Sequence, residues 1–98
     1  MKCNELFFSL HIIERMVERD IDKKALVDVL NNGETIEKYP NDKPFPSFLL
    51  LGFIGKTPIH LVVAKDPVNM FCVIITAYFP SELIWSNDFK TRRKKWNV

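Results

Sequence analysis

Between residues 59 and 80, two largely apolar runs separated by a short polar stretch predict two β-strands. The strands run over residues 59–65 and 70–79 and are joined by a turn at residues 66–69. β-Branched and aromatic residues fill the second strand, and Pro80, which donates no ladder hydrogen bond, ends it. If a three-residue loop sets the register, the odd-numbered residues of both strands share one apolar face, which is the core side. The even-numbered face mixes aliphatic residues with polar ones: His60, Thr76 and Tyr78.

Helical periodicity precedes these strands. Ser9 is a suitable N-cap for a helix over residues 10–19, and Asp22 for a second helix over residues 23–31. The short connection between them predicts a tight αα-hairpin. Gly33 is expected to end the second helix in the left-handed conformation. At about 100° per residue, the apolar residues of the first helix share one side: Leu10, Ile12, Ile13, Met16 and Val17.

Two further strands are expected between the helices and the central pair. Residues 34–39 carry charges on both faces, as a strand at the edge of a sheet does. Residues 47–54 form a largely apolar strand in which Gly52 indicates a bulge or a close backbone approach. The predicted fold is therefore α+β, in the order ααββββ, with the hairpin packed on a four-stranded antiparallel meander. We divide this single domain, residues 1–98, into a helical hairpin (1–32), a sheet (33–80) and an aromatic and basic tail (81–98).

Composition narrows the class of protein. With 98 residues, 47% hydrophobic and 27% charged, the chain is typical of one soluble globular domain. No signal peptide or membrane span is recognisable, so we expect a cytoplasmic protein that does not enter a membrane. Cys3 and Cys72 are therefore expected to be unpaired, with Cys72 a small apolar residue of its strand. Two His and two Cys without ligand spacing predict neither a metal site nor a cofactor.

The net charge of +2 hides a basic cluster near the carboxyl end. Without this cluster, nine basic residues face twelve acidic ones, which leaves a net charge of −3. Such a block is either a solvated tail or an arm that binds the phosphates of a nucleic acid. The cluster consists of Lys90, Arg92, Arg93, Lys94 and Lys95.

The first helix offers a second polar constellation. His11 and Arg15 lie one turn apart, and Arg19 lies a turn further on. One interpretation is a solvated face with ion pairs between neighbouring turns. The other is a His/Arg pair that meets an anionic substrate, because the guanidinium group binds phosphate in a bidentate manner.

Several motifs along the chain together resemble the domain-of-unknown-function family forty-two fifty-eight. They begin with His11-x-x-x-Arg15-Met16-x-x-Arg19-x-Ile21 and Gly33-Glu34-x-Ile36-Glu37-x-Tyr39-Pro40. They continue with Pro44-x-Pro46-Ser47, Leu51-Gly52, His60-x-Val62 and Ile75-Thr76-x-Tyr78-x-Pro80, followed by Trp85, Asp88-Phe89 and Arg92. The resemblance covers nearly the whole chain. No one of these motifs is distinctive by itself; their combination is.

This resemblance implies a compact fold similar to RelE-like and MqsR-like toxins, which are metal-independent endoribonucleases. It also implies a zinc-finger antitoxin as partner and RNA as substrate. In such a reaction His60 would act as base or acid, Tyr78 would orient or protonate the phosphate, and Arg15 with His11 would complete the site. The residues expected to bind RNA phosphates are Arg19, Arg92, Arg93, Lys94 and Lys95.

Each of these residues also has a structural interpretation. His60 can be a strand histidine bonded to a neighbour, and Tyr78 can be an amphipathic sheet residue with its hydroxyl in water. The alternative function is accordingly a non-catalytic module that binds a protein or a nucleic acid, or a homodimer formed through the half-apolar sheet face.

Overall fold

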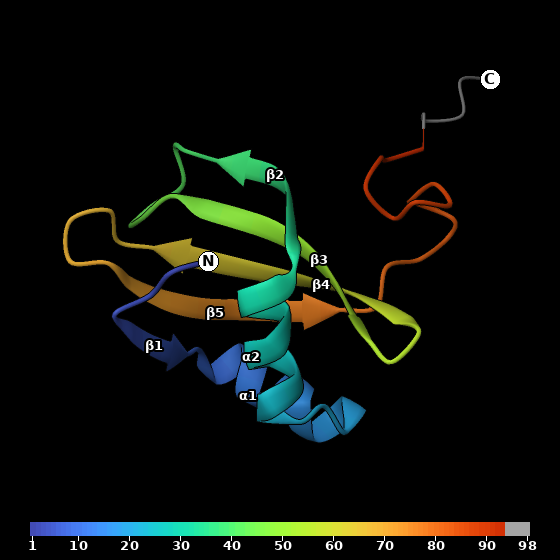
Figure 1. Ribbon diagram of the computed structural model, residues 1–98, viewed down its shortest axis with the longest axis horizontal. Helices are drawn as coiled ribbons and strands as arrows, with labels where there is room; N and C mark the ends of the chain where they lie inside the picture. The colour runs from blue at the N-terminus through green and yellow to red at the C-terminus, as the bar shows by residue number, and fades with distance from the viewer. Residues whose placement is uncertain (94–98) are drawn as a thin grey trace.

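A five-stranded mixed sheet carries both helices on one of its faces (Figure 1). The computed structural model describes residues 1–93. The strand order across the sheet is β1-β5-β4-β3-β2, and β2 is an edge strand as predicted. The elements are β1 (Glu5–Phe8), α1 (Leu10–Arg19), α2 (Lys23–Asn32), β2 (Glu34–Tyr39), β3 (Ser47–Ile54), β4 (Thr57–Lys65) and β5 (Phe71–Tyr78).

The first strand, β1, corrects the predicted topology. It precedes the helices and pairs in parallel with β5, Leu6 opposite Cys72 and Phe8 opposite Ile74. The α+β class and the four predicted antiparallel neighbours β2 to β5 are confirmed, but the sheet has a fifth, parallel strand, so the order is βααββββ and not the predicted ααββββ. A run of four residues has too little periodicity to be recognised as a strand, and its partner lies more than sixty residues away in the chain.

The ends of both helices follow from local hydrogen bonds, with one correction. The Ser9 hydroxyl accepts the amide proton of Ile12, and the Asp22 carboxylate accepts that of Lys24, as N-caps do. Gly33 ends α2 but has an extended backbone, with φ −71°. Glycine is needed there for space, because an added Cβ would lie 2.5 Å from the Val29 carbonyl oxygen. The left-handed cap is instead Asp20, at the end of α1.

The helices pack on different strands rather than forming a close hairpin. α1 lies mainly against β5, whereas α2 lies against β3 and β4. The contact between α2 and β3 is close at Gly52, where an added Cβ would lie 2.7 Å from a methyl carbon of Val29. Of the two predicted alternatives at Gly52, the close approach is confirmed, and the group that approaches is the Val29 side chain.

A bulge in β5 changes which residues face the helices. Val62 pairs with Thr76 and Val63 with Ile74, so Ile75 has no partner in β4. Before this bulge the even-numbered residues of β5 lie in the core, and after it the odd-numbered ones do. The predicted sharing of one face is correct for Ile59, Leu61, Val63 and Ala77, but Cys72 and Ile74 are core residues and Phe71 and Val73 lie on the other face.

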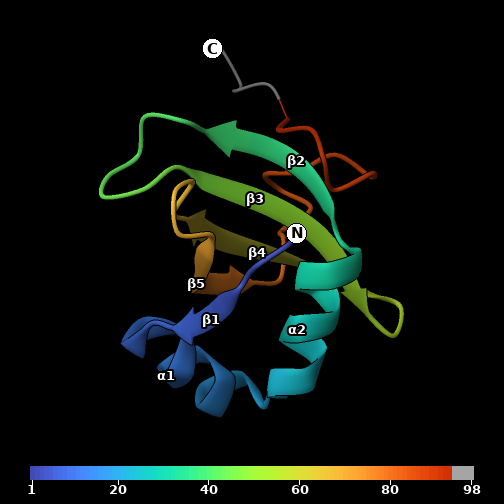
Figure 2. The same cartoon turned by 60° about the vertical axis from the view of Figure 1, so that its left-hand side comes forward.

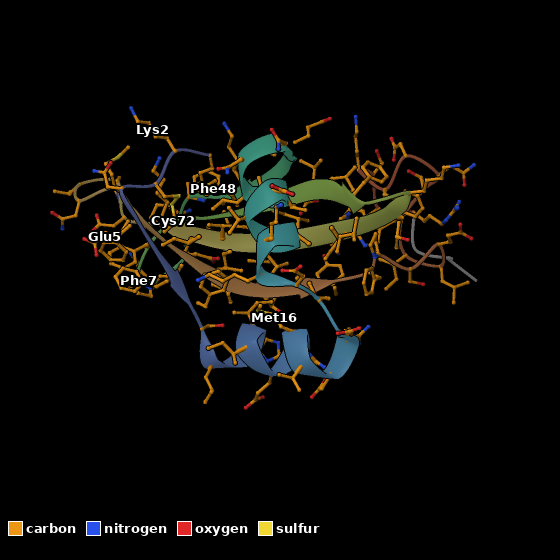
Figure 3. The ribbon with its side chains drawn as sticks, turned by 60° about the horizontal axis from the view of Figure 1, so that its bottom comes forward. Lys2, Glu5, Phe7, Met16, Phe48 and Cys72 are labelled. Carbon is orange, nitrogen blue, oxygen red and sulfur yellow. A yellow bond between two sulfur atoms is a disulfide. The ribbon has the colours of Figure 1, made fainter. Side chains whose placement is uncertain are left out.

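The apolar side of α1 is only partly buried. Ile12 is fully buried and Met16 lies between α1 and the sheet (Figure 3). Leu10, Ile13 and Val17 are exposed. A single helix packed on a sheet buries only a narrow stripe, so the rest of the apolar side of α1 faces outward.

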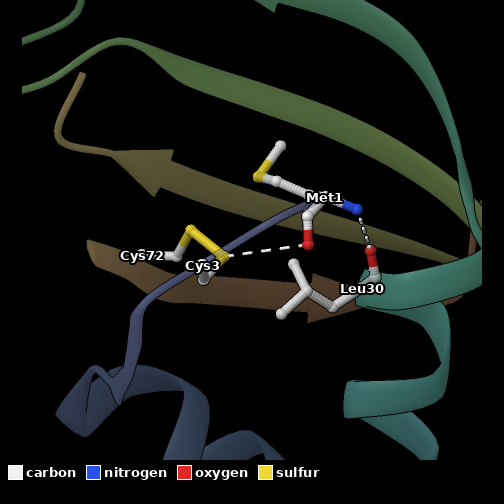
Figure 4. Close-up of a disulfide and its surroundings, with 4 residues drawn as sticks. All are labelled: Met1, Cys3, Leu30 and Cys72. Carbon is white, nitrogen blue, oxygen red and sulfur yellow. Dashed lines mark hydrogen bonds between the residues drawn. A yellow bond between two sulfur atoms is a disulfide. The ribbon is translucent and has the colours of Figure 1, made fainter. Parts of the chain in front are cut away.

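Cys3 and Cys72 form a disulfide, which corrects the expectation of unpaired thiols (Figure 4). Their Cα atoms are 5.6 Å apart, and the pair joins the segment before β1 to β5. Close by, the amino group of Met1 donates a hydrogen bond of 2.8 Å to the carbonyl oxygen of Leu30 in α2. The amino end is thereby attached to both the sheet and the helix layer.

The described part of the tail, residues 81–93, lies on the face of the sheet opposite the helices (Figure 2). It folds back on itself through a bridge between Trp85 and Arg92 and a hydrogen bond from the Arg93 amide to the Ile84 carbonyl. Trp85 is 2% exposed and covers this end of the sheet.

Candidate functional site

His60 is the central buried group on the tail-covered face of the sheet. Its side chain is fully buried, and its ring meets that of Trp85 edge-on at a centroid distance of 4.5 Å. Nε2 lies 2.7 Å from the Phe89 carbonyl oxygen, which can only accept a hydrogen bond, so Nε2 carries the proton. Nδ1 lies 3.1 Å from the Tyr78 hydroxyl, which donates to it. Both ring nitrogens are thus occupied in the neutral imidazole.

Burial determines the protonation of this pair. It lowers the pKa of His60 below its usual range, because the charged imidazolium is poorly solvated there. Burial also raises the pKa of Tyr78, against the opposing effect of the Arg92 charge. A neutral imidazole and a neutral phenol are the forms that suit the observed hydrogen bonds.

A second polar cluster lies beside His60 and consists of Glu37 and Tyr39 of β2 with Arg92 of the tail. The Tyr39 hydroxyl donates a hydrogen bond to the Glu37 carboxylate. Nη2 of Arg92 lies 3.5 Å from the same carboxylate oxygen. Arg92 also stacks on Trp85, its guanidinium carbon 4.7 Å from the ring centroid. We call Glu37, Tyr39 and Arg92 the Glu–Tyr–Arg cluster.

The cluster is more accessible than His60. The side chains of Arg92 and Glu37 are 55% and 31% exposed, so a ligand can reach both. Burial and the hydrogen bond with Glu37 raise the pKa of Tyr39, which keeps the phenol protonated. The neighbouring Tyr39 and Glu37 raise the pKa of Arg92. The result is a carboxylate, a proton-donating phenol and a permanent cation within contact of one another.

The fold explains why these residues meet. Glu37 and Tyr39 are two residues apart in a strand, so their side chains share a face. Across the sheet Glu37 pairs with Leu49, Leu49 with Val62, and Val62 with Thr76, which places this row next to the row of His60 and Tyr78. Arg92 reaches the cluster because the tail turns back at Asp88. The Asp88 carboxylate accepts hydrogen bonds from Ser86 and from the amides of Lys90 and Thr91.

These hydrogen bonds stabilise the charged form of Asp88. The hydrogen bond from Ser86 is the largest cause, and the pKa of Asp88 is lowered to about 2. The carboxylate is therefore charged at neutral pH and holds the turn that positions Arg92.

The predicted site residues of α1 lie apart from His60 and Tyr78. Helix α1 packs on one face of the sheet (Figure 2). His60 and Tyr78 pair with each other and project from the opposite face. His11 and Arg19 are exposed, and Arg15 pairs with Glu18 at 2.9 Å. The structure thus brings His60, Tyr78 and Arg92 together and leaves His11, Arg15 and Arg19 on another surface.

The remaining basic residues of the predicted cluster are Lys90 and Arg93, which the structure describes, and two lysines that it does not. Lys90 pairs with Glu34 at 2.9 Å, and Arg93 donates hydrogen bonds to the Glu82 carbonyl and to Asn87. Lys94 and Lys95 lie outside the described residues.

Glu37 and Tyr39 are the members of the site that the sequence reasoning missed. The available signal was their spacing, since two polar side chains at i and i+2 in a strand project from the same face. Nothing local indicates that Arg92, more than fifty residues later, would meet them.

Within residues 1–93 the structure has neither a cluster of metal ligands nor a membrane-spanning helix. This range holds no group of three or more His, Cys, Asp or Glu side chains arranged around a metal ion. Neither helix in it has the length and apolarity needed to cross a bilayer.

Fold and site together define an α+β domain with a polar cluster on the sheet face that its helices leave uncovered. Residues 8–79 match the profile of the family described as Domain of unknown function (DUF4258), and the chain belongs to that family. Comparisons with curated proteins and with solved structures give no match.

Proposed function

We propose that this domain is a metal-independent endoribonuclease whose reaction centre is the Glu–Tyr–Arg cluster. The proposal rests on one observation: Glu37 contacts both Tyr39 and Arg92, so that a carboxylate, a phenol and a guanidinium group lie together at a partly exposed position. RNA cleavage without a metal ion needs a base, a cation and an acid, and the cluster supplies one of each.

The reaction assigns one role to each residue. Glu37 takes the proton of a ribose 2′-hydroxyl, whose oxygen then attacks the adjacent phosphorus. Arg92 stabilises the negative charge that develops on the phosphate oxygens. Tyr39 donates its proton to the departing 5′-oxygen, and the products are a 2′,3′-cyclic phosphate and a 5′-hydroxyl.

His60 and Tyr78 have a supporting role in this proposal. His60 holds the tail through Phe89 and supports Trp85, on which Arg92 stacks. They are therefore positioning residues, whereas Glu37, Tyr39 and Arg92 are the catalytic ones.

The test is cleavage of a fluorescent RNA oligonucleotide by the purified protein, with and without EDTA. An otherwise identical all-DNA strand, which lacks the 2′-hydroxyl, is expected to remain intact. Removing the base in Glu37→Gln is expected to slow cleavage about 100-fold. The matched control is Glu5→Gln, which changes a carboxylate on the opposite edge strand. Unchanged cleavage by a folded Glu37→Gln variant would disprove the assigned centre.

A second candidate function is RNA binding without cleavage. It is favoured by the contacts within the cluster itself, because the Glu37 carboxylate already accepts the Tyr39 proton and pairs with Arg92, which competes with proton exchange with a substrate. A folded wild-type protein that leaves RNA intact but binds it in fluorescence anisotropy would support this candidate. Arg92→Lys would then weaken binding, because a lysine keeps the charge and loses the planar fork.

A further inference from the structure

The outer side of α1 is an apolar surface that the rest of residues 1–93 leaves uncovered. Leu10, Ile13 and Val17 are 73%, 47% and 80% exposed. Their spacing of three and four residues places them on one side of the helix. Single exposed apolar residues are ordinary, but a continuous row of them marks an interaction surface.

The row borders a groove between α1 and the start of α2. This groove has a volume of about 280 Å³ and is lined by Phe8, Ile13, Met16, Val17 and Lys23. Its lining is apolar except for Lys23, whose ammonium lies 5.3 Å from the centroid of the Phe8 ring. The groove can therefore receive apolar side chains from a partner laid along α1.

Opposite charges border the apolar row on its two sides. At about 100° per residue, Glu14 and Glu18 follow Leu10 around the helix on the side away from the groove. Glu18 also pairs there with Arg15 of its own helix at 2.9 Å, so Glu14 is the acid of this border that makes no salt bridge within residues 1–93. Lys23 stands on the groove side, where it lines the groove together with Ile13 and Val17. A fitting partner therefore presents an apolar row with a basic border opposite Glu14 and Glu18 and an acidic border opposite Lys23.

We propose that the partner is a second copy of this chain, with the two α1 helices parallel across a two-fold axis. In a parallel pair, the acidic border of each helix meets the Lys23 border of the other helix. Glu14 and Glu18 of each copy then face Lys23 of its partner, and the two apolar rows are buried together. An antiparallel pair would bring acid to acid and Lys23 to Lys23, which disfavours it.

The first experiment measures mass against protein concentration by sedimentation equilibrium. We expect a reversible monomer–dimer equilibrium for the wild-type chain. Val17→Glu is expected to weaken association at least about ten-fold, since it places a charge in the apolar row. Leu83→Glu, at a residue that is 90% exposed elsewhere, is the matched control and should dimerise like the wild type.

A charge exchange tests the parallel arrangement. Lys23→Glu alone and the double variant Glu14→Lys/Glu18→Lys should each associate about ten-fold more weakly, because each makes both borders of its helix alike. Mixing the two variants should restore dimers, since each then meets a complementary border. All sites are on the surface, so circular dichroism is expected to show unchanged folding.

Two results would overturn the proposed α1 dimer, and a third would overturn its parallel arrangement. One is a wild-type chain that stays monomeric up to millimolar concentration. The other is a dimer unaffected by Val17→Glu, which would mean that association uses another surface. A dimer broken by Val17→Glu but not restored by mixing the charge variants would reject the parallel arrangement.

Discussion

The two faces of the sheet are buried by different means. On the helix-covered face, Ile59, Leu61 and Ile74 lie in a continuous apolar core with residues from both helices. On the tail-covered face, the buried side chains include His60 and Ser47. Each of these has a hydrogen-bond partner, and no buried side-chain nitrogen or oxygen among residues 1–93 lacks one.

The two faces therefore differ in what their side chains require of the fold. Apolar packing is non-directional, so the helix-covered face is expected to tolerate apolar substitutions that keep its volume. Polar groups need partners at defined positions, so the tail-covered face depends on particular pairs. The Glu–Tyr–Arg cluster therefore lies where the fold already specifies individual contacts.

The largest expected effect comes from the disulfide that fastens the amino end at the helix-covered face. The double variant Cys3→Ser/Cys72→Ala removes a cross-link between residues 69 apart in the sequence. We expect the free energy of unfolding in urea to fall by about 4 kcal/mol, because the unfolded chain regains the loop entropy. A variant as stable as the oxidised wild type would show that this link contributes nothing to the folded state.

Trp85→Ala is expected to have the next largest effect and to act on the other face. It removes the buried ring that covers His60 and supports Arg92, at a cost of about 3 kcal/mol in unfolding free energy. Leu83→Ala, at an exposed neighbour in the same segment, is the matched control. A loss below about 1 kcal/mol would mean that the tail does not act as a covering layer.

The smallest effect is a pH dependence specific to the tail-covered face. His60 has a lowered pKa in the folded protein, so below about pH 6.5 the unfolded chain binds more protons than the folded one. The contribution of His60 to the free energy of unfolding should therefore be fully present above pH 6.5. As the pH falls it should decrease by at most about 1.4 kcal/mol per unit, until the folded-state pKa is reached.

The pH effect is measured as the difference in unfolding free energy between pH 7.5 and 5.5. His60→Gln is expected to reduce that difference, whereas His11→Gln, at an exposed histidine of α1, should leave it unchanged. Equal pH dependence in the wild type and His60→Gln would show that the imidazole is not held neutral by the fold.

The sequence alone determined the elements that depend on neighbouring residues. The caps at Ser9 and Asp22, the whole of α1, and the bounds of β2 and β3 were predicted as observed. Hydrogen bonds within one helical turn and the alternation along a strand cause these features, and both can be seen in a short stretch of sequence. His60 and Tyr78 were likewise correctly predicted to share one face, although their direct pairing was not predicted.

Only the tertiary structure decided the contacts between distant segments. The pairing of β1 with β5, the bulge at Ile75, the Cys3–Cys72 bond and the meeting of Glu37 with Arg92 all join residues through the topology of the sheet. One unpaired residue in β5 reverses which side chains enter the core, and no local pattern specifies it. The physical reason is that such contacts depend on how distant segments pair and pack in the folded chain, whereas caps and periodicity depend on a few adjacent residues.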